Sequence, residues 1–283
     1  MKTTNIYNLP KAFENLANEE YEITPNSYGA TTMLKGVREI ILTRRYFNDI
    51  EQDVSDMVWM ILGSAVHQIL ESHDKTGQAE TKFMHNVSKS RVTGVIDLYN
   101  DGVVEDYKTA TVWKVIFGDF EDWRRQGIIY VWLLRKNGIY ADKLRFHALL
   151  KDWSAREARY KKDYPQHSVW TWRYNVTTDD LIWIEQWLTD KIHRIESMLD
   201  MADDDLPQCS VDERWQTPCK YAAMKNGRKS ALKVSENKAD VEGIGDYVET
   251  RNGEARKCMD YCPVRNICKY GRESRAIMPE SEI

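Results

Sequence analysis

The chain has 283 residues, of which 42% are hydrophobic and 30% are charged, and these values are ordinary for a globular protein. The length suits one large domain, or one domain with a small appendage. The net charge of −4 excludes a strongly basic nucleic-acid-binding chain, although a local basic patch could still bind phosphates. The sequence has no signal peptide and no run of about 18 apolar residues, which predicts a cytoplasmic protein without a membrane span.

The first half of the chain predicts helices followed by strands. Residues 1–26 carry mixed polar signals and predict an irregular N-terminal arm. Helical spacing of apolar residues predicts one helix from Ser27 to about Phe47 and a second, largely buried helix over about Ser55–Ser72. The apolar period then changes to two, which predicts a β-meander with strands at 82–89, 92–99 and 103–108.

The second half predicts further helices and strands and then a different kind of sequence. A helix is expected near 119–137, strands near 143–151 and 168–175, and an amphipathic helix from Thr178 to about Asp200. Residues 206–283 have low apolar content, five cysteines and no clear periodicity. The sequence therefore predicts an arm (1–26), a core domain (27–205) and a cysteine-rich appendage (206–283).

A hairpin in the meander places two acids together. Asp101-Gly102 is a strong signal for a two-residue turn. Counting back from this turn gives the facing pairs Asn100–Val103, Tyr99–Val104, Leu98–Glu105 and Asp97–Asp106. Directly opposed carboxylates, with β-carbons about 5 Å apart, repel each other and destabilise a sheet. A divalent cation between Asp97 and Asp106 would remove this conflict.

The strand alternation also places Lys108 on the same face as Asp106. A divalent ion makes its bound water a better nucleophile, and an adjacent lysine can orient or deprotonate that water or stabilise charge on a phosphate. The alternative is a hairpin whose aspartates and lysine form ordinary surface ion pairs.

Two predicted helices could point further polar groups at this hairpin. His67 and Glu71 are four residues apart and share one face of an apolar helix, where they could add metal ligands. The alternative for His67 is a hydrogen-bonded histidine of the core. Gln126 and Tyr130 have the same spacing and could contact phosphate or hold the lysine, although this pair alone carries little information.

The order of these features resembles the RecB-like branch of the PD-(D/E)XK nucleases. The matching residues over about 27–150 are Gly63 and His67 for G-x-x-x-H, Gly94 and Asp97 for G-x-x-D, Asp106 and Lys108 for (D/E)-x-K, and Gln126 and Tyr130 for Q-x-x-x-Y. Ile96 replaces the usual proline, as is common in this branch. The layout is similar to that of phage-encoded exonucleases and of iron–sulfur CRISPR-adaptation nucleases.

The resemblance implies an α/β fold: a restriction-endonuclease-like core with a central mixed β-sheet flanked by helices. It implies that His67, Asp97, Asp106 and the backbone carbonyl of Tyr107 bind Mg²⁺ or Mn²⁺, with Glu71 in a supporting or second-metal role. Lys108 would act on the attacking water, and Gln126 and Tyr130 would position DNA or the lysine.

The implied function is a metal-dependent DNA nuclease, an exonuclease in phage recombination or DNA end processing. Two alternatives remain open: a CRISPR-adaptation-type nuclease, and a non-catalytic DNA-binding or assembly module on a decayed nuclease fold. The expected partner is DNA with single-stranded or duplex ends. The sequence contains no helicase P-loop pattern, so any unwinding would come from a recombination or helicase partner protein.

The cysteines suggest a second metal centre. Cys258, Cys262 and Cys268 form a tight trio, and Cys209 is the favoured fourth ligand, with Cys219 as the alternative. Such thiolates suit zinc or an iron–sulfur cluster, and a bound metal would help a poorly apolar tail to fold.

Families that the chain resembles carry a [4Fe–4S] cluster held by three late cysteines and one distant cysteine that precedes the first motif. The matching stretch here, 34–38, has no cysteine. Zinc and free thiols therefore stay open beside the [4Fe–4S] cluster.

Basic residues in three stretches could bind phosphates, which requires cations but little sequence specificity. The candidates are Arg44, Arg45, Lys151, Arg156, Lys161, Lys162, Arg228 and Lys229. The alternative for each stretch is an ordinary solvated face.

Overall fold

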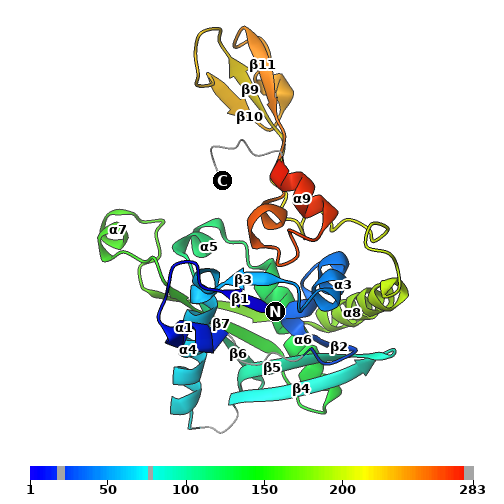
Figure 1. Ribbon diagram of the computed structural model, residues 1–283. Coiled ribbons are helices and arrows are strands. Elements are labelled where there is room, and N and C mark those ends of the chain that lie inside the picture. Colours follow the sequence, from blue (N-terminus) through cyan, green and yellow to red (C-terminus); the bar gives the residue numbers. More distant parts are fainter. Residues whose placement is uncertain (18–22, 76–78, 277–283) are drawn as a thin grey trace. The chain divides into compact units, whose positions relative to one another are not determined.

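The computed structural model describes residues 1–17, 23–75 and 79–276 (Figure 1). The chain divides into two compact units, which are considered separately. The first contains Met1–Lys35 and Glu51–Leu199, and the second contains Gly36–Ile50 and Asp200–Ile283. The predicted arm and appendage each include residues outside the described ranges. Within the described ranges, no helix is both long enough and apolar enough to cross a membrane.

A mixed sheet forms the centre of the first unit. Its strands are β2 (Ser27–Gly29), β4 (Ala79–Val87), β5 (Ser90–Asn100), β6 (Val103–Ala110), β7 (Lys143–Leu150) and β8 (Val169–Asn175). The order is β2-β5-β6-β7-β8, and β4 also pairs with β5. Strand β5 pairs with β2 through residues 91–93, with β6 through residues 98–100, and with β4 through residues 90–98. The β2–β5 and β6–β7 pairs are parallel, whereas the pairs β4–β5, β5–β6 and β7–β8 are antiparallel.

The first unit also contains helices, some of which pack against this sheet. They are α1 (Lys11–Ala17), α2 (Ala30–Met33), α4 (Val58–His73), α5 (Val112–Phe117), α6 (Glu121–Lys136), α7 (Ala155–Tyr160) and α8 (Thr178–Met198), with a 3₁₀ turn η1 (Val54–Met57) and a small parallel pair β1 (Lys2–Thr4) and β3 (Glu51–Asp53). Helix α6 contacts β4, β5 and β6, α8 contacts α6 and β4, and α4 contacts β6. The predicted α/β fold, a central mixed sheet flanked by helices, is confirmed.

The core of this unit forms where α6 meets the sheet. Ile128, Ile129 and Leu133 of α6 are fully buried, as is Phe146 of β7. The contact is close at Gly94 of β5, because a β-carbon there would lie 2.8 Å from a Leu133 methyl and 2.9 Å from the Tyr130 ring. A glycine at this position lets α6 approach the sheet and brings the polar face of α6 toward β6.

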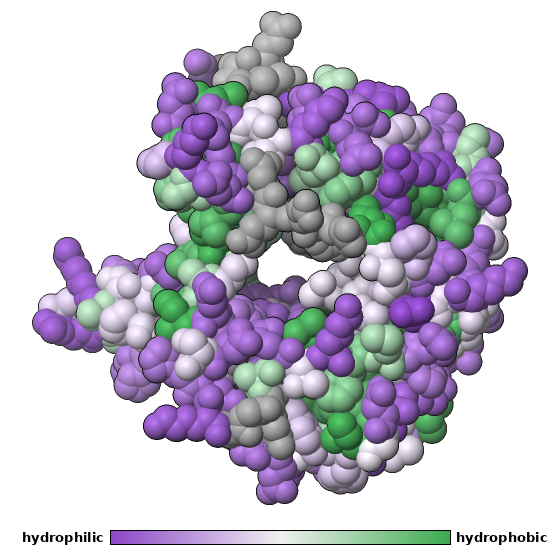
Figure 2. Space-filling view, turned by 60° about the horizontal axis from the view of Figure 1, so that its bottom comes forward, coloured by the Kyte–Doolittle hydropathy of each residue, from purple (hydrophilic) through white to green (hydrophobic). Residues whose placement is uncertain are grey.

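Two sequence predictions for the helices were wrong. The single helix expected over 27–47 is interrupted, because Ser27–Gly29 forms a strand beside β5 and Gly36 has an extended, non-helical backbone. The helix expected to be largely buried is α4, yet none of its residues is buried, and Trp59 and Ile69 are 58% and 60% exposed. Apolar spacing predicts which face of a helix can be buried, but it does not show whether another element buries that face. Apolar residues reach the surface in several places on the face shown in Figure 2.

The second unit combines an early helix with the end of the chain. Its elements are α3 (Val37–Arg45), β9 (Lys220–Met224), β10 (Lys233–Ser235), the 3₁₀ turn η2 (Lys238–Asp240), β11 (Tyr247–Arg251), the π-helical turn η3 (Lys257–Tyr261) and α9 (Lys269–Ala276). The strands form an antiparallel sheet in the order β10-β9-β11. The sequence did not anticipate that 36–50 would group with the cysteine-rich residues.

Candidate active site

The predicted hairpin forms the base of the site. Asp101 and Gly102 both have positive φ angles, 44° and 78°, as a tight turn of the type I′ class requires. The facing pairs Asn100–Val103, Tyr99–Val104 and Leu98–Glu105 agree with the predicted register.

The ladder between β5 and β6 ends before the two aspartates. Leu98–Glu105 is the pair of this ladder farthest from the turn, while β6 continues beside β7 as far as Ala110. Oδ2 of Asp97 instead accepts a hydrogen bond of 2.7 Å from the backbone N–H of Tyr107. Asp97 and Asp106 therefore lie near each other where the strands separate, rather than as a regular cross-strand pair.

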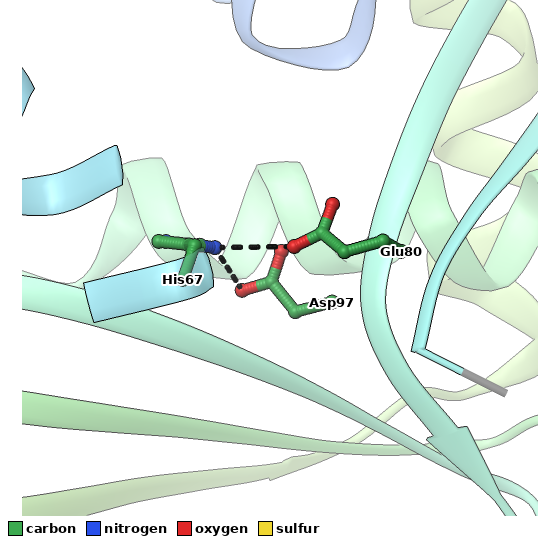
Figure 3. Close-up of side chains that lie close together, drawn as sticks. All are labelled: His67, Glu80 and Asp97. Carbon is green, nitrogen blue, oxygen red and sulfur yellow. Dashed lines mark ion pairs between the residues drawn. The ribbon is translucent and has the colours of Figure 1, made fainter. Parts of the chain in front are cut away.

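The side chains of His67, Glu80 and Asp97, which come from three different elements, lie close together (Figure 3). Nδ1 of His67, on α4, lies 3.3 Å from Oδ2 of Asp97, on β5, and 3.5 Å from Oε1 of Glu80, on β4. One potential ligand atom from each residue lies within 4.8 Å of the other two. Among the described residues, these three side chains lie close enough together to hold a metal ion.

Glu80 is a site residue that the sequence analysis missed, because the strand was expected to begin at residue 82. In the β4–β5 ladder, Ala79 pairs with Leu98 and Thr81 with Ile96, so Glu80 falls opposite Asp97 but outside the ladder. Its φ of 48° lies in the left-handed region, which costs a non-glycine residue roughly 1–2 kcal/mol. Strained residues of this kind concentrate at functional sites. Extending the predicted strand backwards would have placed Glu80 beside Asp97.

Asp106 and Lys108 form a separate, more buried pair. Asp106 is 1% exposed, and its Oδ2 lies 2.7 Å from the Lys108 ammonium. Nε2 of Gln126 lies 3.3 Å from Oδ1 of Asp106 and donates to the Tyr130 hydroxyl at 2.7 Å. The Gln126–Tyr130 pair on α6 thus holds the aspartate.

The group of His67, Glu80 and Asp97 and the Asp106–Lys108 pair approach β6 from different faces of the sheet. Tyr107 faces α4, where its ring makes an edge-to-face contact with His67 at 6.2 Å, whereas Asp106 faces Gln126 of α6. Successive side chains of a strand point to opposite faces, so α4 and α6 lie on opposite faces of β6 here. Because β5 and β6 separate here, Asp97 lies near Asp106 as well as His67.

A small pocket opens at the Asp97 group. Its lining residues are His67, Leu70, Glu71, Asp74, Ala79, Glu80, Asp97, Leu98 and Tyr107. Glu71 thus lies at the site, as its position relative to His67 suggested. Asp106 and Lys108 are not among these described lining residues.

The electrostatics of the group favour a cation. The hydrogen bond with Asp97 raises the pKa of His67 to about 9. Burial raises the pKa of Asp106 to about 6 against the opposing effect of Lys108, and burial and Asp97 raise the pKa of Glu80. Protonation of His67 supplies one positive charge to clustered acids. A divalent ion could replace that proton and let all the carboxylates ionise, so the donor set fits a metal.

Electrostatic interactions link four cysteines of the second unit, although no three of these described cysteines have their sulfurs within 4.8 Å of one another. The Cys258 thiol interacts electrostatically with Cys209, Cys262 and Cys268. Cys262 and Cys268 are buried, and Cys209 and Cys258 are half-buried. Cys219 directly precedes β9. The sequence analysis favoured the first four as the ligand set.

N–H groups point at three of these sulfurs. The backbone N–H groups of Glu39 and Val264 donate to Cys209 and Cys262, respectively. Nε of Arg38, which is only 2% exposed, lies 3.1 Å from Sγ of Cys268. A neutral thiol is a weak acceptor, whereas a thiolate is a strong one, so these donors suit sulfurs that bind a metal.

The predicted DNA-binding residues occupy both units. In the second unit, Arg45 forms an ion pair of 2.5 Å with Asp203, and Arg44 lies beside it in the last turn of α3. Arg228 and Lys229 are exposed between β9 and β10. Arg45 thus has a structural contact, and its role toward DNA stays a prediction.

In the first unit, the Lys151 ammonium lies 3.7 Å from the ring centre of Trp59. Arg156 is on α7, Lys161 pairs with Glu157, and Lys162 is exposed. DNA binding by these residues also stays a prediction.

No family model matches this sequence, and no curated protein matches it. Several solved structures, including the following three, are similar to it. SSO0001 has a TM-score of 0.45 and 20% identity, over 65% of this chain and 82% of that one. LHK-Exo in complex with dAMP has a TM-score of 0.41 and 13% identity, over 61% and 89%. A phage-related exonuclease from Haemophilus somnus 129PT has a TM-score of 0.41 and 9% identity, over 63% and 96%. At these identities the similarity concerns the fold alone.

Proposed function

We propose that the protein is a Mg²⁺- or Mn²⁺-dependent DNA nuclease of the RecB-like branch of the PD-(D/E)XK superfamily. The observation that carries the proposal is the meeting of His67, Glu80 and Asp97 in a pocket beside the buried Asp106–Lys108 pair. Carboxylates with one imidazole are a donor set that Mg²⁺ and Mn²⁺ accept.

Each residue has a role in this proposal. The bound ion would supply Lewis-acid stabilisation of phosphate and activation of water. His67, Glu80, Asp97 and Asp106 would hold the ion, with the Tyr107 carbonyl and Glu71 as further ligands. Lys108, kept in place by Asp106, would orient or deprotonate the attacking water or stabilise charge on the phosphate. Gln126 and Tyr130 position Asp106 through their hydrogen bonds.

The proposed substrate is DNA with single-stranded or duplex ends, cleaved as an exonuclease in phage recombination or end processing. The exposed cations of α7 and of the β9–β10 loop are the candidate phosphate contacts. A recombination or helicase protein would supply any unwinding.

We propose for the second unit a metal centre held by the thiolates of Cys209, Cys258, Cys262 and Cys268. A [4Fe–4S] cluster is the first candidate and zinc the second. The N–H donors that point at three of the sulfurs support this assignment, because such donors stabilise negative charge on sulfur.

Cleavage of labelled DNA with Mg²⁺, with Mn²⁺ and without metal tests the nuclease. Lys108→Ala is expected to lower the rate by about 100-fold or more, because it removes the group that acts on water. Lys143→Ala, at an exposed lysine that begins the neighbouring strand β7, is the matched control and should cleave normally. Equal cleavage by the Lys108→Ala and wild-type proteins would rule out this active site.

A further inference from the structure

Gly36 has no backbone reason to be a glycine. It precedes the first turn of α3 with φ −64° and ψ 146°, a conformation that any residue adopts. A β-carbon at this position, however, would lie 2.5 Å from Sγ of Cys209 and 3.2 Å from its Cβ. Oε2 of Glu213 would lie 3.1 Å away, so the Cys209 sulfur is the atom nearest to the space that a side chain at position 36 would fill.

The sulfur of Cys209 is held at the N-terminus of α3. The backbone N–H of Glu39, at the third position of the helix, donates to it. The first N–H groups of a helix have no acceptor within the helix, and the helix dipole favours a negative charge there. A thiolate bound to a metal would satisfy both requirements, whereas burial and Glu213 raise the pKa of the metal-free Cys209 thiol to about 11. The same sulfur interacts electrostatically with Cys258, which in turn interacts with Cys262 and Cys268.

The same part of the second unit buries charged groups that suit a thiolate centre. Arg38 donates to Cys268 and to the backbone carbonyl of Leu206, and its guanidinium lies 4.9 Å from the centre of the Tyr270 ring. Glu39 is 3% exposed and forms an ion pair of 2.6 Å with Lys257. Helix α3 therefore contributes Glu39 and Arg38 as donors to two different sulfurs.

We infer that Cys209 supplies the fourth sulfur ligand of the thiolate centre from the space that a side chain at position 36 would fill, so that a cysteine at position 36 can replace it. This inference rests on the metal centre proposed above. A thiol on position 36 would begin at a β-carbon 2.5 Å from the present sulfur, so one further bond brings its sulfur into the same region. The Glu39 N–H and the other three cysteines would then face it unchanged.

Metal content tests this directly in the full-length protein, purified without oxygen. Cys209→Ala is expected to lose the visible absorbance of an iron–sulfur cluster and most of the bound iron, or the bound zinc if zinc is the metal. Gly36→Cys combined with Cys209→Ala should regain the metal. Gly36→Ser combined with Cys209→Ala is the matched control, since it adds a side chain without a thiol, and should remain metal-poor. Gly36→Ala alone should lose metal because its β-carbon displaces the Cys209 sulfur.

The outcomes separate this inference from the proposals on which it rests. Cys219→Ser should keep its metal, and a Cys209→Ala protein with wild-type metal content would overturn the inference. A folded Gly36→Cys, Cys209→Ala protein, judged by its circular dichroism, that stays metal-free would overturn it as well. If the wild-type protein binds neither iron nor zinc, the metal centre itself is wrong, whereas DNA cleavage still reports on the nuclease site.

Discussion

The two units bury their polar groups in different ways. The first unit has an apolar core that includes Ile128 and Phe146. Its candidate site lies where strands β5 and β6 separate. In the second unit, Arg38 and Glu39 are buried at the start of α3, where they contact Cys268 and Cys209, respectively. The first unit should therefore keep its fold when its metal is removed, whereas the proposed centre of the second unit is part of its packing.

Removal of one sulfur from the second unit should have the largest effect on structure. Cys258 interacts with the other three cysteines, so Cys258→Ser should abolish metal binding and destabilise η3, α9 and the start of α3. Hydrogen exchange should show amide protection there reduced by about 100-fold or more, given the large free energy of metal binding in small domains. Amides of β5, β6 and β7 should keep their protection.

The matched control is Cys219→Ser, which should leave both patterns unchanged. Equal loss of protection in β5–β7 would show that the first unit also depends on the cysteine centre. Unchanged protection around η3 would show that the centre does not support the fold.

Neutralising Asp106 should separate stability from activity in the first unit. Asp106→Asn should abolish DNA cleavage, yet raise the melting temperature of the metal-free protein. Burial raises the folded-state pKa of Asp106 to about 6, above the unfolded value of about 4. The ionised carboxylate therefore destabilises the folded state fully above pH 6 and not below about pH 4. The stabilisation by asparagine should reach about 2 kcal/mol at neutral pH and vanish in acid.

Thermal unfolding in EDTA across this pH range measures the effect. Glu105→Gln is the control, because the neighbouring Glu105 pairs with His147 and Arg145 and not with the site. A stabilisation by Asp106→Asn that persists at low pH would contradict the assigned cause.

Sequence reasoning succeeded where a single local signal was sufficient. The Asp101-Gly102 turn fixes the register of β5 and β6, and the two-residue period places Lys108 next to Asp106. It did not show that β6 leaves β5 near Asp97 and continues beside β7, because a long crossover separates β6 from β7 in the sequence. It also could not show that β2 interrupts the first predicted helix, since β2 pairs with residues 91–93.

Cys209 and Glu80 illustrate the same limit. The sequence favoured Cys209 as a ligand but found no cysteine in 34–38, and only the fold places the Cys209 sulfur against Gly36. Glu80 was missed because the predicted strand began at residue 82, whereas β4 begins at Ala79. Contacts between distant segments leave no periodic trace in a single sequence.

Glu80 offers a smaller but more specific perturbation than Asp106. Glu80→Gln should weaken Mg²⁺ binding and cleavage by about 10- to 100-fold, because it removes one negative charge from the ligand group while keeping the strained backbone. Glu80→Gly should lose activity similarly, yet be about 1 kcal/mol more stable than Glu80→Gln in the absence of metal, since glycine tolerates a φ of 48°.

Urea unfolding in EDTA and cleavage at varied Mg²⁺ concentration separate the two contributions. Glu51→Gln, at an exposed acid on β3, is the control and should change neither quantity. Equal stability of the two Glu80 variants would mean that the backbone at this residue is not strained.

The smallest expected effect concerns the helix cap at the start of α8. Thr177 begins α8 with a capping box, in which its hydroxyl accepts from the Asp180 N–H and the Asp180 carboxylate accepts from the Thr177 N–H. Thr177→Ala should cost about 1 kcal/mol, and Thr178→Ala, at the neighbouring exposed threonine, should cost much less. Because α8 packs on α6 and β4, this loss should appear in the unfolding of the first unit. Metal content of the second unit should stay constant, and a parallel fall in it would show that the two units do not hold their structures independently.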